Sequence, residues 1–218
     1  MKMKKLKRTL TVLLVTFLTL SLIGGNASAA SFKDTRGHWA ERVIDKWSKM
    51  GIIRGYDGMF NPDEGIIRGD MAVILCRVMK YEVMNTNTFS DLDMTEYYAD
   101  EVLMLNHEGV MLGADGYVRP LDKITREEAF SMLNRIYKYE GGDAPVFEDV
   151  DCVSDWARDD VYALCASGII HGSEGKINPT DNITRAEIIQ LLENISVSVK
   201  FDSTTGIGED DLWVGEIR

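Results

Sequence analysis

Residues 168–187 read GIIHGSEGKINPTDNITRAE, and the same arrangement occurs earlier as GIIRGYDGMFNPDEGIIRGD at 51–70 and as GVMLGADGYVRPLDKITREE at 109–128. In each copy a glycine comes first, a second glycine follows four residues later, a proline seven after that, and an arginine six after the proline. Identical internal spacing marks a structural repeat, in which one supersecondary unit packs against copies of itself. Counted from its first aromatic residue, the repeat is about 45 residues long and begins near Phe32, Phe89 and Phe147.

Each copy is predicted to contain two helices joined by a glycine-rich loop. Between His38 and Met50 the apolar residues recur every three or four positions, which is typical of a helix with one buried face. These residues are Trp39, Ala40, Val43, Ile44, Trp47 and Met50; the later copies present Tyr97, Tyr98, Val102 and Leu105, and Trp156, Ala157, Val161 and Leu164. Gly51, Gly109 and Gly168 follow these helices, where a left-handed residue commonly ends a helix.

An acidic residue followed by glycine stands in the loop of every copy, as Asp57-Gly58, Asp115-Gly116 and Glu174-Gly175. An Asp-Gly pair also occurs in calcium-binding loops, but the alternating oxygen ligands and the closing bidentate glutamate of such a loop are missing. We therefore predict a tight turn at each position, and no metal site.

The second helix of the later copies begins with a capping box, Thr125-Arg126-Glu127-Glu128 and Thr184-Arg185-Ala186-Glu187. In a capping box the threonine hydroxyl accepts from the third helical amide, and the glutamate accepts from the threonine amide. The predicted structural caps are therefore Thr125, Glu128, Thr184 and Glu187. The first copy has Ile67-Arg68-Gly69-Asp70 instead, which lacks the threonine and predicts a frayed helix start.

An arginine occupies the first helical position of all three copies, as Arg68, Arg126 and Arg185. The helix dipole opposes a cation there by about a few tenths of a kcal/mol, so each arginine needs a negatively charged partner. That partner is either an intramolecular carboxylate or an external anion that also binds the free amides of the helix.

Together these features resemble the S-layer homology domain in three tandem copies. The resemblance rests on Phe32-Lys33-Asp34, Trp39-Ala40, Gly51–Tyr56, Phe60-Asn61-Pro62, Phe147–Val150, Trp156-Ala157, Gly168–Gly172 and Thr184–Glu187, the last being the family's hallmark tetrapeptide. It spans about residues 32–197. It implies an all-α fold, in which three helix-loop-helix repeats at 31–82, 83–140 and 141–197 have a pseudo-threefold arrangement around a central helical bundle.

The resemblance also implies a function, because family members bind cell-wall carbohydrate without a covalent bond, often a pyruvylated secondary cell wall polymer attached to peptidoglycan. A ketal-linked pyruvate is a carboxylate, which an arginine at a helix N-terminus suits. The implied ligand-binding residues are Arg68, Arg126 and Arg185 for the acidic group; Asp34, Asp91 and Asp149 for hydroxyls; Trp39, Tyr97 and Trp156 for sugar rings; and Gly55, Gly113 and Gly172 for close approach to the backbone.

The residues themselves leave structural alternatives open for this set. Trp39, Tyr97 and Trp156 stand at the start of an apolar stripe and also suit core packing. The aspartates either cap the first helices or pair with the arginines.

The N-terminal residues 1–30 are predicted to be a secretory signal peptide. A basic segment precedes an apolar run from Leu10 to Ile23, which is short for a membrane span, and Ala27-Ser28-Ala29 supplies a cleavage site. We expect a secreted protein that does not insert into the membrane after signal removal and is attached to the cell wall or cell surface.

The remaining chain is strongly acidic. Five of the 24 Lys and Arg residues and none of the 35 Asp and Glu residues lie in residues 1–30, which leaves a formal net charge of −16. Such a surface disfavours nucleic acid as a partner, but a local basic pocket can still bind an anion.

No feature of the repeat favours catalysis. The residues capable of acid or base chemistry recur threefold, whereas a glycan hydrolase needs an asymmetric pair of carboxylates. We therefore expect neither enzyme activity nor a cofactor. Cys76, Cys152 and Cys165 are odd in number; a Cys152–Cys165 bridge is an open alternative, while Cys76 and Cys165 fall on apolar helix faces.

Residues 198–218 are predicted to be a short acidic tail, too short for a domain of its own. Immediately before and within it, residues 197–201 alternate apolar and polar residues and suit a strand. The chain is then a complete wall-binding module, a module whose tail docks a protein partner, or a fragment of a longer product. The alternative function is therefore surface-layer assembly through this tail.

Overall fold

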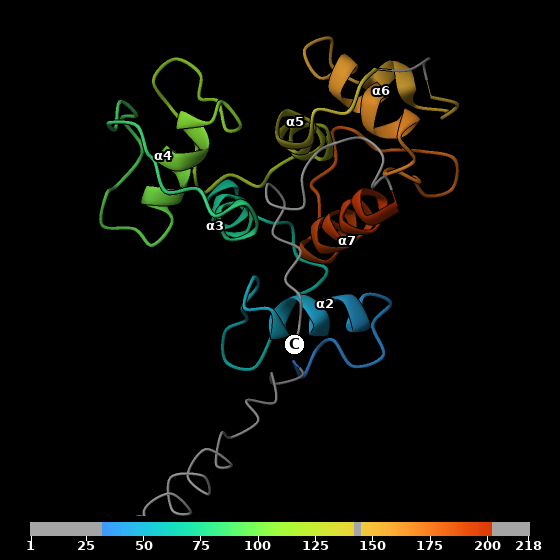
Figure 1. Ribbon diagram of the computed structural model, residues 1–218, viewed down its shortest axis with the longest axis horizontal. Helices are drawn as coiled ribbons and strands as arrows, with labels where there is room; N and C mark the ends of the chain where they lie inside the picture. Colours follow the sequence, from blue (N-terminus) through green and yellow to red (C-terminus); the bar gives the residue numbers. More distant parts are fainter. Residues whose placement is uncertain (1–31, 142–144, 202–218) are drawn as a thin grey trace, which may run out of the picture. The chain divides into compact units, whose positions relative to one another are not determined.

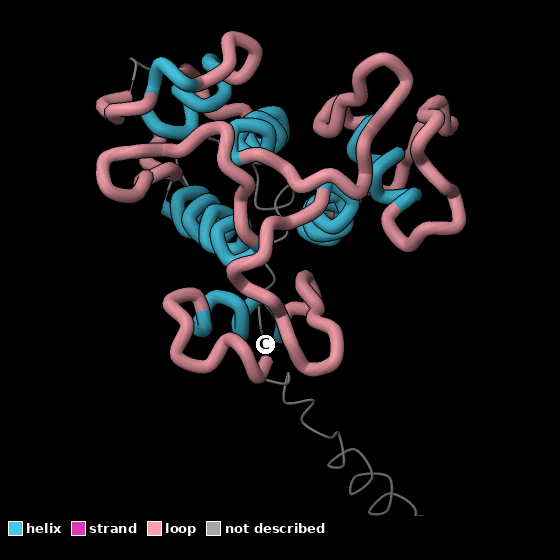
Figure 2. Tube along the Cα trace, turned by 180° about the vertical axis from the view of Figure 1, so that it is seen from behind, coloured by secondary structure: helices cyan, strands magenta, loops and turns pink. Residues whose placement is uncertain are grey.

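The computed structural model describes residues 32–141 and 145–201, and its helices follow the three sequence copies (Figure 1). The first copy contains α2 (Glu41–Lys49) and α3 (Arg68–Met79), and the second contains α4 (Ala99–His107) and α5 (Arg126–Tyr137). The third contains a short 3-10 helix η1 (Val150–Cys152), α6 (Arg158–Ala166) and α7 (Arg185–Phe201). The described residues form no strand, only isolated bridges (Figure 2), so the all-α prediction is confirmed. The pseudo-threefold arrangement stays a prediction.

The first helix of each copy buries most of the predicted apolar stripe, but the aromatic residue that leads the stripe is exposed. In the first copy Ala40, Ile44 and Trp47 are buried, whereas Trp39 is 61% exposed. Tyr97 and Trp156 are likewise 63% and 54% exposed. The helical period does not apply to these three residues because each precedes the first residue of its helix. Packing of Trp39, Tyr97 and Trp156 in the core was therefore the wrong alternative.

Glycines end the first helices as predicted. Gly51, Gly109 and Gly168 have φ angles of 74°, 68° and 72°, in the left-handed region that glycine adopts without steric cost. The loops that follow contain the predicted tight turns. Asp57 and Gly58 both have positive φ, and Tyr56 and Met59 on either side exchange two backbone hydrogen bonds of 2.9 Å, which is the geometry of a type I′ turn.

The second helices begin at the arginine in every copy, α3 included. The frayed start predicted for α3 is not found, although Ile67 supplies no side-chain cap. Instead, the amides of Arg68 and Gly69 donate to the carbonyl oxygens of Asp122 and Pro120 at 2.9 and 2.8 Å. A Cβ on Gly69 would lie 2.7 Å from the ring of Tyr98, so this glycine permits close packing against the second copy.

The same backbone contacts recur around the three copies. Arg126 and Glu127 donate their amides to Asp181 and Pro179, and Arg185 and Ala186 donate theirs to Glu64 and Pro62. The first two amides of each second helix are therefore bonded to the loop of another copy and are not free for an external anion.

Helices pack in pairs across copies rather than within them. The contacting pairs are α3 with α4, α5 with α6, and α2 with α7, as can be followed in Figure 1. At the last pair, the indole nitrogen of Trp47 and the ammonium of Lys46 both donate to the carboxylate of Glu193 at 2.8 Å. Each first helix thus buries its apolar face only because a neighbouring copy is present.

Three isoleucines that precede the second helices close a circle of backbone hydrogen bonds. The amide of Ile66 donates to Ile183, that of Ile183 to Ile124, and that of Ile124 to Ile66, at 3.0, 3.1 and 3.0 Å. All three side chains are buried. Its three links join residues 117, 59 and 58 positions apart in the sequence, so no single copy can form it.

The end of the described chain differs from its prediction. Residues 197–201 belong to α7, which continues to Phe201, so the predicted strand is wrong. Five alternating residues are too few to specify a strand by themselves. Tertiary packing decides whether so short a segment becomes a strand or continues a helix. The predicted signal peptide at 1–30 and the tail from residue 202 lie outside the described residues.

All three cysteines are free thiols, so the alternative of a Cys152–Cys165 bridge is wrong. Burial raises the pKa of the Cys76 thiol to about 12, with smaller contributions from Glu101 and Glu108, and burial raises that of Cys165 to about 11. Both therefore stay protonated near neutral pH and act as small apolar residues, as the helix pattern predicted.

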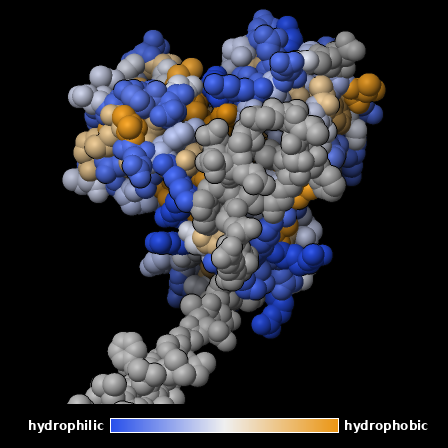
Figure 3. Space-filling view, viewed as in Figure 1, coloured by the Kyte–Doolittle hydropathy of each residue, from blue (hydrophilic) through white to orange (hydrophobic). Residues whose placement is uncertain are grey.

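Over residues 32–141 and 145–201, no helix is long and apolar enough to cross a lipid bilayer. The same residues contain no group of three or more His, Cys, Asp or Glu side chains placed to hold a metal ion. The face shown in Figure 3 is mostly hydrophilic, with apolar residues in small groups.

Candidate functional site

The three repeated arginines reach into the loop of another copy. Arg68 donates from Nε to the carbonyl of Val118 at 2.9 Å, from Nη2 to Leu112 at 3.1 Å, and from Nη1 to Oε1 of Glu128 at 3.1 Å. Only 3% of Arg68 is exposed. Its removal from water lowers the pKa of the guanidinium, and the carboxylate of Glu128 opposes that shift.

Arg126 and Arg185 repeat this pattern with their own partners. Arg126 donates to the carbonyl of Ile177 and to Glu187, both at 2.6 Å. Arg185 donates to the carbonyls of Phe60 and Arg54 and, at 2.9 Å, to Oδ2 of Asp70. In every copy the intramolecular carboxylate, one of the two predicted alternatives, is present.

Two of the three carboxylates that accept from the arginines, Glu128 and Glu187, also cap helices. Oε2 of Glu128 accepts from the Thr125 amide at 2.9 Å, and the Glu128 amide donates to Oγ1 of Thr125 at 3.3 Å. Thr184 and Glu187 exchange the equivalent bonds at 2.8 and 3.2 Å. Both predicted capping boxes are confirmed, and each joins a helix start to an arginine of another copy.

The three aspartates organise the loops of their own copies. Asp34 accepts from the amides of Phe60 and Asn61, and Asp91 accepts from those of Val118 and Arg119. Asp149 likewise accepts from Ile177 and Asn178. They neither cap the first helices nor pair with the arginines, so both predicted structural alternatives are wrong.

We expect Asp34 to make the stability of the fold depend on acid pH. Burial raises the pKa of this carboxyl, but the amides of Phe60 and Asn61 stabilise its charged form, and the net effect lowers the pKa from its ordinary value. A carboxyl whose pKa is lower in the folded state stabilises the fold above the unfolded pKa, and that contribution is lost as pH falls through the folded pKa.

Replacing Asp34 with asparagine should therefore destabilise the fold by about 1–2 kcal/mol at neutral pH. The difference in unfolding free energy between the two proteins should shrink below about pH 4, because the wild-type carboxyl then protonates. Urea denaturation at pH 7, 5, 4 and 3 measures this difference. A difference that stays constant over this range would contradict the assigned role.

The loop glycines are required by packing within their own copies. A Cβ on Gly172 would lie 2.6 Å from both the Phe147 ring and the carbonyl of Lys176. Gly55 and Gly113 are equally close to Phe32 and Phe89. This contact explains why glycine recurs at these positions without any ligand.

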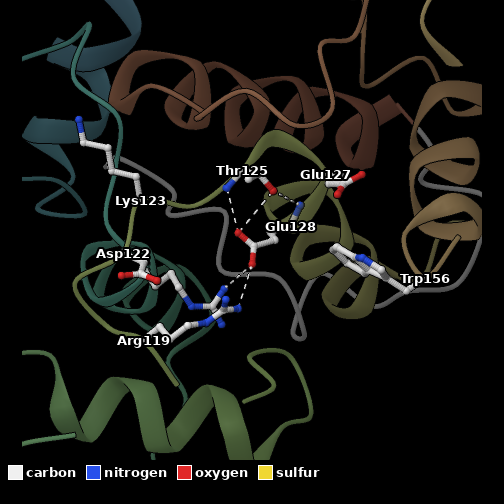
Figure 4. Close-up of a pocket in the computed structure, with 8 residues that line it drawn as sticks. Arg119, Asp122, Lys123, Thr125, Glu127, Glu128 and Trp156 are labelled. Atoms are coloured by element: carbon white, nitrogen blue, oxygen red, sulfur yellow. Dashed lines mark hydrogen bonds and ion pairs between the residues drawn. The ribbon is translucent and has the colours of Figure 1, made fainter. Parts of the chain in front are cut away.

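One polar pocket of about 390 Å³ lies where residues of all three copies meet (Figure 4). Its lining is Arg68, Arg119, Asp122, Lys123, Thr125, Glu127, Glu128 and Trp156. It brings together four of the residues singled out in the sequence, namely Arg68, Thr125, Glu128 and Trp156.

Four lining residues were missed by the sequence analysis: Arg119, Asp122, Lys123 and Glu127. A signal existed at one of them, since Arg119 stands where the other copies have Asn61 and Asn178. Glu127 is buried and accepts from the Ser154 amide and hydroxyl at 2.9 and 2.8 Å. It thereby fixes the segment that carries Trp156.

The pocket has the chemistry of a site for a hydrophilic ring-shaped ligand. An exposed indole offers an apolar surface, while arginine and carboxylate groups provide donors and acceptors that fix orientation. The equivalent aromatic residue of the second copy, Tyr97, is engaged differently. Its hydroxyl donates to Oδ1 of Asp70 at 2.5 Å.

Helix-loop-helix copies that complete one another around a polar pocket define a repeat-built binding module. Three segments of the chain match the model of the S-layer homology domain, at residues 31–72, 88–130 and 146–189. The chain belongs to this family. Membership identifies it as a module for attachment to the cell wall at the cell surface.

Relatives are found among surface-layer proteins and large enzymes. The chain is 30% identical over 172 residues to an amylopullulanase of Thermoanaerobacterium thermosulfurigenes, covering 74% of this chain and 9% of that protein. It is 30% identical over 198 residues to the surface-layer 125 kDa protein of Lysinibacillus sphaericus, covering 85% and 17%. The S-layer protein EA1 of Bacillus anthracis is 30% identical over 174 residues, covering 76% and 20%. The chain thus spans less than a tenth of the amylopullulanase and at most a fifth of the two surface-layer proteins.

Proposed function

We propose that the module anchors its protein by binding an acidic cell-wall polysaccharide, such as a pyruvylated secondary cell wall polymer, in the pocket lined by Arg68, Glu128 and Trp156. The pocket is the observation that supports this proposal. It is polar, is built from all three copies, and presents a half-exposed indole beside arginine side chains.

The predicted ligand-binding residues take different roles in this proposal. Trp156 packs against a sugar ring, and exposed Trp39 offers a comparable surface on the first copy. Arg68 and Arg126 act mainly through the carboxylates and carbonyls that they hold in place. The aspartates and loop glycines shape the loops that the polysaccharide contacts.

The pocket is proposed to bind its ligand without catalysing a reaction. A hydrolytic site needs one carboxyl free to donate a proton and a second free to activate water or attack. The carboxylate of Glu127 accepts two hydrogen bonds from Ser154, and that of Glu128 receives Thr125 and Arg68. Both carboxylates are therefore engaged in holding the copies together.

Assembly through a protein partner is the weaker candidate. It relied on the tail at 198–218, of which the strand edge at 197–201 is replaced by the end of α7, while the rest lies outside the described residues.

Co-sedimentation with purified cell walls tests the proposal. The chain from Ser31 onward is mixed with native sacculi and with sacculi stripped of secondary polymer by hydrofluoric acid. Binding to native walls alone is the expected result. Equal binding to both would make peptidoglycan the ligand, and binding to neither would contradict the anchoring function.

A further inference from the structure

One lining residue of the pocket departs from the repeat at a conformationally demanding position. Arg119 has a φ of 52°, while its counterparts Asn61 and Asn178 have φ of 56° and 48°. Asparagine tolerates this left-handed conformation far better than arginine, whose Cβ crowds the neighbouring backbone there. Residues held in such conformations cluster at functional sites. The second copy therefore carries a costly side chain where the other two carry the favoured one.

The side chain of Arg119 adds a second cation to a carboxylate that already has one. Its Nη2 lies 3.6 Å from Oε1 of Glu128, the atom that accepts from Arg68 at 3.1 Å. Figure 4 shows the Arg119 guanidinium beside the Glu128 carboxylate. The other oxygen of Glu128 is occupied by the Thr125 amide. One carboxylate oxygen thus faces two guanidinium groups, while Asp122 lines the same pocket and adds negative charge near Arg68.

Arg119 is accessible, unlike the arginine beneath it. Its side chain is 53% exposed, against 4% for that of Arg68. Its long contact to Glu128 leaves planar guanidinium donors available for a bidentate partner.

At the two equivalent contacts between copies, the carboxylate pairs with one guanidinium rather than two. Asp70 accepts from Arg185 on one oxygen and from the Tyr97 hydroxyl on the other. Burial, together with the hydrogen bond to Asp70, raises the pKa of Tyr97, so the phenol stays protonated and keeps donating. Glu187 pairs with the single arginine Arg126. Asparagine stands at the Arg119 position in both cases.

We propose that Arg119 is a specificity-determining residue, which makes this pocket the carboxylate-selective site of the module. A ligand carboxylate accepts from the Arg119 guanidinium, while the attached sugar ring lies toward Trp156. The Arg68–Glu128 pair holds Arg119 in place from below. This inference rests on the proposed function and assigns its charge recognition to one residue.

The decisive variant is Arg119→Asn, which installs the residue of the other two copies. It should bind native sacculi about 10- to 100-fold more weakly, because a charge-assisted bidentate contact is lost. Its melting temperature should not fall, because asparagine suits the left-handed backbone. The matched control is Arg158→Asn, which removes the same charge from an exposed site paired only with Asp155, and should bind as wild type does.

A second arm identifies the group that Arg119 recognises. Sacculi with amidated carboxyl groups should bind wild type as weakly as the Arg119→Asn variant, and that variant should not weaken further. Undiminished binding by the variant to native walls would overturn the inference while leaving the proposed function standing. Wild-type binding that survives amidation would exclude a carboxylate. Wild type that binds no wall at all would refute both proposals.

Discussion

Replacing Arg68 with alanine is expected to lower the free energy of unfolding by about 3–5 kcal/mol, which is the cost of removing one partner from a buried, hydrogen-bonded ion pair. The change removes the three hydrogen bonds that the Arg68 side chain donates to the second copy, two to carbonyl oxygens and one to Glu128. It takes the side-chain donor from two carbonyl oxygens and leaves Oε1 of Glu128 with only the longer contact to Arg119. Equilibrium denaturation in urea measures the loss.

Arg158→Ala is the matched control for this measurement. Arg158 is about half exposed and pairs with Asp155 within the same helix start, so its loss should cost less than about 1 kcal/mol. Similar stabilities for the two variants would mean that Arg68 does not join the copies energetically. Wall binding by the Arg68 variant should be read only at temperatures where it is folded, because folding and binding depend on the same side chain.

Replacing Gly113 with alanine is expected to destabilise the fold by about 3 kcal/mol, the upper end of the cost of adding a methyl group to a filled site. The new Cβ would lie 2.7 Å from the carbonyl oxygen of Tyr117 and closer still to the ring of Phe89. The carbonyl oxygen belongs to the backbone, so the loop must shift to accept the methyl group, and Arg119, Asp122 and Lys123 further along that loop line the pocket.

Gly141→Ala is the control here, because a Cβ at Gly141 would have no atom within 4 Å. Its melting temperature should match that of wild type, while that of Gly113→Ala should fall by several degrees. If the two variants have the same melting temperature, packing does not explain the glycine at position 113. Close approach of a ligand then becomes the better explanation. Wall binding of the folded Gly113 variant would then test that explanation.

The repeated arginine joins the copies to one another in this structure. A cation at a helix N-terminus indicated a negatively charged partner, and the structure supplies one from another copy each time. The helix amides that an external anion would have used are bonded to loop carbonyls. Recognition of the ligand's negative charge is therefore proposed for Arg119, a position that holds asparagine in the other two copies.

The sequence by itself determined the parts of this protein that depend on neighbours close in the chain. The capping boxes at Thr125 and Thr184, the left-handed glycines after the first helices and the turn at Asp57-Gly58 follow from contacts within a few residues. Such contacts are formed by the local backbone, so residue type and spacing suffice to predict them.

Only the tertiary structure decided which copies supply the partners of each helix and each arginine. The pairing of α2 with α7, the hydrogen bonds among Ile66, Ile124 and Ile183, and the choice of Glu128 as partner of Arg68 all join residues from different copies. Three nearly identical units offer chemically equivalent partners, so local pattern cannot distinguish a bond within a copy from one between copies. The pocket depends on that choice, because Arg68, Arg119 and Trp156 come from three different copies and meet only when each copy packs against the others.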